Sequence, residues 1–198
     1  VLGIASGTAE GIGGAIYQLF SHGLISALLF MVVGVLYDRT HDRQIGNYSG
    51  LTHQMPQFTV FVVVAFFASL GLPGMSGFIA ELLVFLGTFA SAGQNELLPR
   101  WFAIVSTLGL ILGAAYYLWT LQRMFFGDFK VRQEDWKERL KDLSVREYLM
   151  MTPLVLATIL FGIWPDFLLE TINPAVNELV NWLQVSESFS PDLIKGSR

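Results

Sequence analysis

One acidic side chain lies inside a long apolar stretch of this chain. Glu81 is the only charged residue between Phe58 and Ala90, a run of 33 residues. A charged side chain at the centre of a bilayer costs about 2.5–3.5 kcal/mol on insertion scales, so such residues usually face a protein interior or a wet cavity. This position favours a carboxylate that exchanges a proton or Na⁺. The structural alternative is an acid held in a permanent salt bridge or kept neutral.

A helix-breaking run, Leu72-Pro73-Gly74-Met75-Ser76-Gly77, precedes Glu81. Proline lacks a backbone N–H, and its ring clashes with the preceding helical turn. An interrupted helix at membrane depth is tolerated only where the freed backbone lines protein or water. Its half-helix ends supply dipoles and free carbonyls to ions. We therefore expect two half-helices joined at Pro73 and Gly74, with Glu81 on a helix face that also carries Thr88.

A second set of polar residues recurs at helical spacing near the N-terminus. Gly14, Gln18, His22 and Ser26 follow one another every four residues. Such a stripe on an apolar helix must face protein or water. Because histidine titrates near neutral pH, His22 could carry protons, with Gln18 and Ser26 as supporting polar groups. The alternative is a hydrogen bond between helices that never titrates.

The composition is that of a membrane protein. Hydrophobic residues make up 53% of the 198 residues and charged residues 14%, with a mean hydropathy of +0.53. Soluble domains average about 25% charged residues. There is no cysteine, which excludes disulfides, thiolate metal sites and iron–sulfur ligation within the chain. The net charge of −4, without a basic block, gives no indication of nucleic-acid binding.

We expect an all-α, polytopic bundle of about four transmembrane spans, one of them discontinuous. The bundle covers residues 1–165, with spans near 12–37, 58–90, 101–121 and 147–164. Residues 130–146 are expected as a cytoplasmic amphipathic segment with a helix at the membrane surface. Residues 166–198 are expected as a further amphipathic segment, ending in a disordered tail from Ser186. The chain begins at Val1 rather than Met, and we expect a fragment or one half of a split gene.

Lysine and arginine residues predict the orientation. Nine of the twelve fall in the loops after the first and third spans, and three fall on the other side. The excess of positive charge marks the cytoplasmic side. Residues 130–146 should therefore be cytoplasmic and the C-terminus outside.

Four motifs resemble consecutive helices of the antiporter-like subunits of respiratory complex I, most closely the family of subunit M and mitochondrial chain 4. They are Ser21–Leu24 with Tyr37–His41 for the eleventh helix, Leu72–Glu81 for the discontinuous twelfth, Gln122–Gly127 for the end of the thirteenth, and Leu143–Glu147 with Gly162–Pro165 for the fourteenth. The motifs follow the order of the family over nearly the whole chain.

The resemblance implies a 14-helix subunit with two inverted five-helix repeats, of which this chain would be the C-terminal part. It places His22 on a central hydrophilic axis and Glu81 at the terminal proton-exchange position. Proton transport would then depend on other membrane-arm subunits, on the missing N-terminal helices and on the lipid bilayer. NADH, FMN, iron–sulfur clusters and quinone would bind to partner subunits, and no cofactor to this chain. The location would be the bacterial inner membrane.

The expected function is that of a proton-translocating subunit of an NADH:quinone oxidoreductase that carries no redox site. One alternative with the same fold is a subunit of a multi-subunit Na⁺/H⁺ antiporter or of a membrane-bound hydrogenase. A second is an inert, truncated scaffold whose polar residues only hold helices together. A third is a subunit that reacts with quinone.

Overall fold

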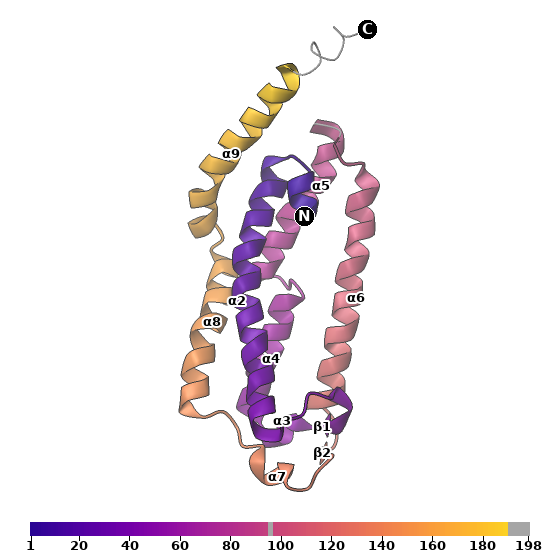
Figure 1. The fold of residues 1–198 in the computed structure, drawn as a ribbon, viewed down its shortest axis with the longest axis vertical. Coiled ribbons are helices and arrows are strands. Elements are labelled where there is room, and N and C mark those ends of the chain that lie inside the picture. The colour runs from indigo at the N-terminus through magenta and orange to yellow at the C-terminus, as the bar shows by residue number, and fades with distance from the viewer. Residues whose placement is uncertain (95–96, 190–198) are drawn as a thin grey trace.

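The computed structural model describes residues 1–94 and 97–189 as an elongated helical bundle (Figure 1). Its elements, in chain order, are α1 (Leu2–Ala5), α2 (Ala9–Thr40), the short 3-10 helix η1 (Ile45–Asn47), β1 (Tyr48–Ser49), α3 (Leu51–Gln54), α4 (Pro56–Ser69), α5 (Ser76–Gln94), α6 (Arg100–Phe125), β2 (Lys130–Val131), α7 (Trp136–Arg139), α8 (Val145–Ile163) and α9 (Asp166–Phe189).

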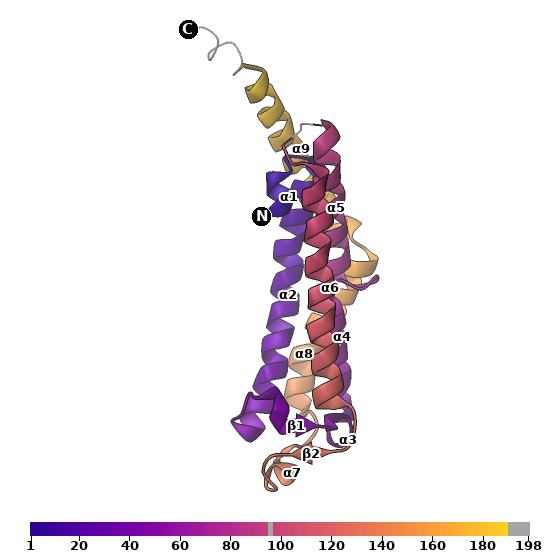
Figure 2. The same cartoon turned by 90° about the vertical axis from the view of Figure 1, so that its right-hand side faces the viewer.

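The expected fold class, a helical bundle with about four spans, is confirmed. Four of the described helices, α2, α5, α6 and α8, are long and apolar enough to cross a membrane. The shorter apolar helix α4 runs end to end with α5, so the two form one interrupted passage (Figure 2). The fold is therefore all-α with a discontinuous helix, as the sequence predicts.

Glycines let α2 and α5 pack closely. A side chain at Gly14 of α2 would meet the Cβ of Leu83 at 2.7 Å, and one at Gly87 of α5 would collide with the backbone of Gly11. Small residues at such interfaces allow helix backbones to approach within a membrane. This contact fixes α5, and with it Glu81, against the N-terminal half of α2.

The two loops at one end of the bundle, here called the charged end, are joined by a two-stranded antiparallel sheet in which Tyr48 pairs with Val131 and Ser49 with Lys130. The N-terminus and helix α9 lie toward the other end (Figure 1). The expected surface helix over 130–146 is wrong, because this segment forms strand β2, the single turn α7 and, from Val145, the first residues of α8. Trp136 and Leu140 lie one helical turn apart and are 2% and 0% exposed, so one turn buries both in the protein core.

An ion pair ties the charged end to α8. The Arg39 guanidinium, at the end of α2, donates to both carboxylate oxygens of Glu147, at 2.8 and 2.9 Å. It also donates to the backbone carbonyls of Val35, Lys141 and Asp142. Ser144 and Glu147 form a capping box that begins α8. Arg39 therefore joins α2, the loop before α8 and the first turn of α8.

The C-terminal part differs in one detail from the expectation. Helix α9 continues through Ser186 to Phe189, and the rest of the expected tail lies outside the described residues. Beyond α8, Pro165 has no N–H to offer the carbonyl of Phe161. The buried hydroxyl of Tyr17 donates to that carbonyl instead and so connects α2 to α8.

Candidate functional site

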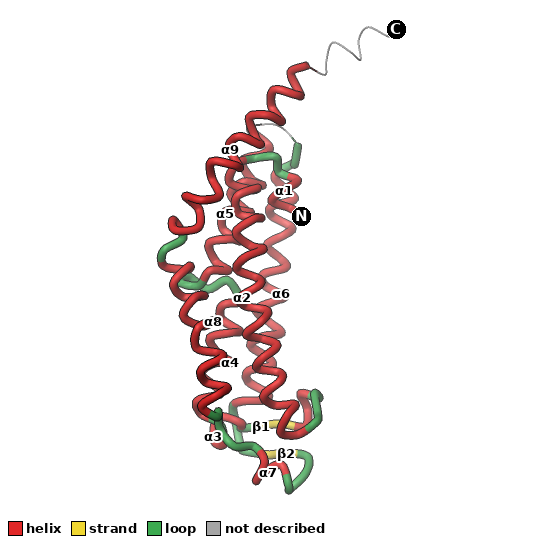
Figure 3. The backbone as a smooth tube through the Cα atoms, turned by 60° about the vertical axis from the view of Figure 1, so that its left-hand side comes forward, coloured by secondary structure: helices red, strands yellow, loops and turns green. Residues whose placement is uncertain are grey.

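The interruption between α4 and α5 begins with a glycine in the left-handed conformation. Gly71 has φ +64, its N–H donates to Ala68, and the N–H of Leu72 donates to Phe67. This pair of bonds is a Schellman motif, which satisfies carbonyls at a helix end. Helix α4, here called the inner half-helix, thus ends at Ser69, four residues before Pro73, and the motif pairs carbonyls that we expected to be free. Figure 3 shows the interruption as a loop halfway along the bundle.

Neighbouring helices hold this loop in place. Gly162 of α8 packs directly against the backbone carbonyl of Gly74, and an added Cβ there would collide with it. Ser76, the first residue of α5, shares a hydrogen bond of 2.7 Å with Ser21 of α2. Both serines are fully buried. The break is therefore a packed element of the fold, fixed from two sides.

Glu81 lies in the second turn of α5 and points back at the break. Its carboxylate lies against Gly71, in the space that a side chain at position 71 would fill. None of the ion pairs within the described residues includes Glu81. Glu81 therefore has no salt-bridge partner in the described part of the chain, where the structural alternative of a permanent salt bridge would need one.

Two cavities meet at Glu81. The first, here called the outer cavity, has a volume of about 390 Å³ and is lined by Gln18, Glu81, Ser106 and residues of α1. The second, here called the inner cavity, has a volume of about 310 Å³ and lies nearer the charged end, at Glu81, Ser69, Gly113, Tyr116 and Tyr117. A carboxyl group in this position can contact water on both sides of the helix break.

The polar stripe of α2 is divided by the structure. Gln18 lines the outer cavity together with Glu81, and its Oε1 is buried with no hydrogen-bond partner among the described residues. His22 is exposed instead, and its Nδ1 lies 3.0 Å from the Ser26 hydroxyl. Neither Glu81 cavity is lined by His22. The structure thus brings Gln18 to Glu81 and leaves His22 and Ser26 on a face that this chain does not cover.

Thr88 has a local role. It is fully buried, and its hydroxyl donates to the carbonyl of Val84 at 2.7 Å. A threonine that bonds the preceding turn satisfies its own hydroxyl within the helix. Thr88 therefore packs inside the bundle and lines neither of the two cavities.

Three hydroxyl groups near Glu81 were missed by the sequence analysis. The hydroxyls of Ser69, the last residue of α4, and Tyr117 of α6 are 2.6 Å apart, and the ring of Tyr116 lies 4.3 Å from that of Tyr117. All three side chains line the inner cavity. For the two tyrosines, the sequence feature that could have revealed them is their spacing from Gly109 and Gly113. This spacing places small and hydroxylated residues on one face of α6.

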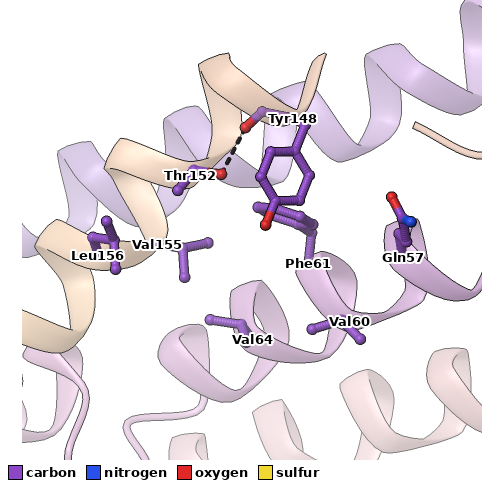
Figure 4. Close-up of a pocket in the computed structure, with 8 residues that line it drawn as sticks. All are labelled: Gln57, Val60, Phe61, Val64, Tyr148, Thr152, Val155 and Leu156. Atoms are coloured by element: carbon purple, nitrogen blue, oxygen red, sulfur yellow. Dashed lines mark hydrogen bonds between the residues drawn. The ribbon is translucent and has the colours of Figure 1, made fainter. Parts of the chain in front are cut away.

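A larger cavity of about 640 Å³ lies between α4 and α8 (Figure 4). It is lined by Gln57, Val60, Phe61, Val64, Tyr148, Thr152, Val155 and Leu156. Thr152 donates to the backbone carbonyl of Tyr148. This lining contains no carboxylate, histidine or amine, so it offers no group for ion exchange at neutral pH. No group of three or more metal-binding side chains occurs among the described residues.

Comparisons with known proteins place the chain in a family of membrane proteins. Residues 1–113 match the family described as NADH:quinone oxidoreductase/Mrp antiporter, transmembrane. The NADH-quinone oxidoreductase subunit M of Rhodobacter capsulatus is 41% identical over 182 residues, which are 90% of this chain and 33% of the relative. The chain thus spans about a third of the length of the relatives it matches.

Two solved structures have the same fold. Respiratory complex I from Thermus thermophilus with bound NADH contains a chain that is 32% identical, with a TM-score of 0.79 over 91% of this chain and 36% of that one. A chain of the Mrp complex from Dietzia sp. DQ12-45-1b is 21% identical, with a TM-score of 0.74 over 90% of this chain and 39% of that one. The similarity to the Mrp chain shows only that the two chains share a fold.

Proposed function

Because this chain belongs to the NADH:quinone oxidoreductase/Mrp antiporter transmembrane family, we propose that it is part of a proton-translocating membrane subunit in which Glu81 exchanges the proton. It is an integral membrane protein with several passages. Its relatives are subunits of NADH:quinone oxidoreductases, so the proposed complex couples quinone reduction to proton transport. The proposed location is the bacterial inner membrane.

The observation that carries the proposal is the position of Glu81 between the outer and inner cavities, directly beside the helix break. A carboxyl group that lines two adjoining cavities can take up a proton from one and release it to the other. Gln18 supports this exchange from the outer cavity. Its unpartnered Oε1 can accept a hydrogen bond from water or from the protonated acid.

His22 has a supporting role in the proposal. Its hydrogen bond with Ser26 orients the ring on the exposed face of α2. Polar groups inside a membrane require a protein or water partner. We infer that helices beyond this chain cover this face and connect His22 to the proton path.

The redox reaction is assigned to partner subunits. NADH, FMN, iron–sulfur clusters and quinone would bind there, and other membrane-arm subunits would contact this one. This chain would contribute no redox site. Its part in the overall reaction is the movement of protons that accompanies quinone reduction.

The experiment replaces Glu81 in the complete complex. Glu81→Gln keeps the shape of the side chain but cannot titrate, so proton pumping and coupled quinone reduction should both fall by at least about tenfold in an assembled complex. Glu81→Asp retains a carboxyl group and should keep more activity. The control is Glu138→Gln, at an exposed acid of α7. Wild-type pumping by assembled Glu81→Gln complex would overturn the proposal.

A Na⁺/H⁺ antiporter subunit is the second candidate, since the chain shares its fold with a chain of the Mrp complex. The two functions differ in the coupled ion. Pumping by reconstituted complex should be unchanged when K⁺ replaces Na⁺ if the proton is the coupled ion. Dependence on Na⁺ would favour the antiporter.

A further inference from the structure

The geometry points to a proton-delivery site in the inner cavity. We propose that the hydroxyls of Ser69 and Tyr117 form a relay that carries protons to Glu81 from the side of the charged end. This inference rests on the proposed function, in which Glu81 exchanges the proton. It adds two residues and a direction of loading that the family likeness does not supply.

The first observation is the hydroxyl pair itself. The oxygens of Ser69 and Tyr117 are 2.6 Å apart and partly buried, a distance typical of a strong O–H···O hydrogen bond. Either oxygen can be the donor. The bond joins the last residue of α4 to α6, so it lies where the inner half-helix ends.

The second observation is that both hydroxyls share a cavity with Glu81. Ser69, Tyr117 and Glu81 come from three different helices and line the same space of about 310 Å³. The wall formed by α6 includes Gly109 and Gly113, and no atom lies within 4 Å of where a Cβ on either would be. A water molecule occupies about 30 Å³ of liquid, so the cavity has room for several waters between the pair and the carboxylate.

Each proton transfer balances at every group. A hydronium ion on the inner side protonates Ser69 Oγ and remains as water, while Ser69 gives its own proton to Tyr117 Oη. Tyr117 gives its own proton to a water beside Glu81, and that water protonates the carboxylate. Each hydroxyl breaks one O–H bond, forms another and ends neutral. The net result is one proton moved to Glu81, and rotation of the two hydroxyls restores the starting arrangement.

Ser69 and Tyr117 need no titration of their own for this role. A hydroxyl can donate one hydrogen bond and accept others at the same time. A relay therefore differs from a purely structural bond, which would only hold α6 against the break. A structural bond should affect assembly or stability when removed, whereas a relay should affect the rate of proton transfer.

The experiment uses the complete complex reconstituted into liposomes. Tyr117→Phe keeps the ring and removes the hydroxyl, and it should lower proton pumping by at least about tenfold with normal assembly. Ser69→Ala should lower it equally, and the double variant should be no slower than either single one. Ser69→Thr keeps a hydroxyl at this position and should therefore keep the pumping rate that Ser69→Ala loses. The control, Tyr148→Phe, makes the same change in a tyrosine that lines the cavity between α4 and α8, away from Glu81.

A second readout separates a relay from a structural bond. Pumping by the wild-type complex should slow in D₂O, and this isotope effect should change in Tyr117→Phe but not in Tyr148→Phe. Wild-type pumping in Tyr117→Phe, together with impaired Glu81→Gln, would overturn the relay and leave the proposed function standing. If Tyr117→Phe does not assemble, equal pumping by Ser69→Ala and Ser69→Thr would overturn the relay. Unimpaired Glu81→Gln would overturn the proposed function itself.

Discussion

The carboxylate of Glu81 packs against Gly71, the residue that ends the inner half-helix. Gly71 adopts φ +64, a left-handed conformation that glycine adopts readily. The same residue therefore ends α4 and leaves space for the acid. This contact makes the position of Glu81 depend on the geometry of the break rather than on α5 alone.

Gly71→Ala should disturb both features. The left-handed conformation costs a residue with a Cβ about 1–2 kcal/mol, and the new methyl group would collide with Glu81. We expect a lower melting temperature of the complex and reduced proton pumping. Both are measured on purified, reconstituted complex.

The matched control for this change is Gly34→Ala on α2. No atom lies within 4 Å of where a Cβ at position 34 would be. Replacing a glycine inside a helix by alanine stabilises it by roughly 0.5–1 kcal/mol, so this variant should be neutral or slightly more stable. Equal behaviour of the two variants would show that the space at Gly71 has no special role.

Arg39→Lys should weaken the charged end. Lysine keeps the positive charge but cannot form the two parallel bonds to Glu147. The side chains of Arg39 and Glu147 are only 13% and 18% exposed, and losing charged hydrogen bonds of this kind costs about 2 kcal/mol. The subunit should melt about 4–8 °C lower.

An exposed ion pair provides the comparison for Arg39. Lys137 pairs with Glu134, and these side chains are 47% and 86% exposed. Exposed pairs contribute about 0–1 kcal/mol, so Lys137→Gln should leave the melting temperature nearly unchanged. An equal fall in both variants would mean that the Arg39 contacts contribute nothing specific.

The sequence predicts the features that depend on local chemistry. Pro73 and Gly74 mark the interruption of the helix that the structure places between α4 and α5. Each signal acts within a few residues, so it can be read without knowing the fold. The exact end of α4 could not be read in the same way, because the Schellman motif at Gly71 is chosen by packing against Glu81 and the neighbouring helices.

Features that depend on distant residues were missed. Trp136 and Leu140 are consistent with a surface helix, but the pairing of β1 with β2 brings them into a core that contains Tyr48. Tyr117 could be placed beside Ser69 only once α6 was known to lie against the break. His22 lies on the same stripe as Gln18, yet only Gln18 reaches the cavity of Glu81.

The orientation in the membrane follows from the charges at the charged end. Nine of the twelve lysine and arginine residues lie in the loops at this end or in the helical turns beside them. We predict that this end faces the cytoplasm. The variant Lys137→Cys, at an exposed position of α7, should react with a membrane-impermeant thiol reagent only after the cells are opened. Labelling in intact cells would contradict this orientation.

The central claim is that Glu81 changes its protonation state during turnover. Infrared difference spectra of the complete complex, recorded before and after addition of NADH, detect the C=O stretch of a protonated carboxyl group. We expect a carboxyl band in the wild-type spectrum that is absent in Glu81→Gln and shifted in Glu81→Asp. Identical carboxyl regions in wild type and Glu81→Gln would contradict the claim, since Glu81 would then keep one protonation state throughout the reaction.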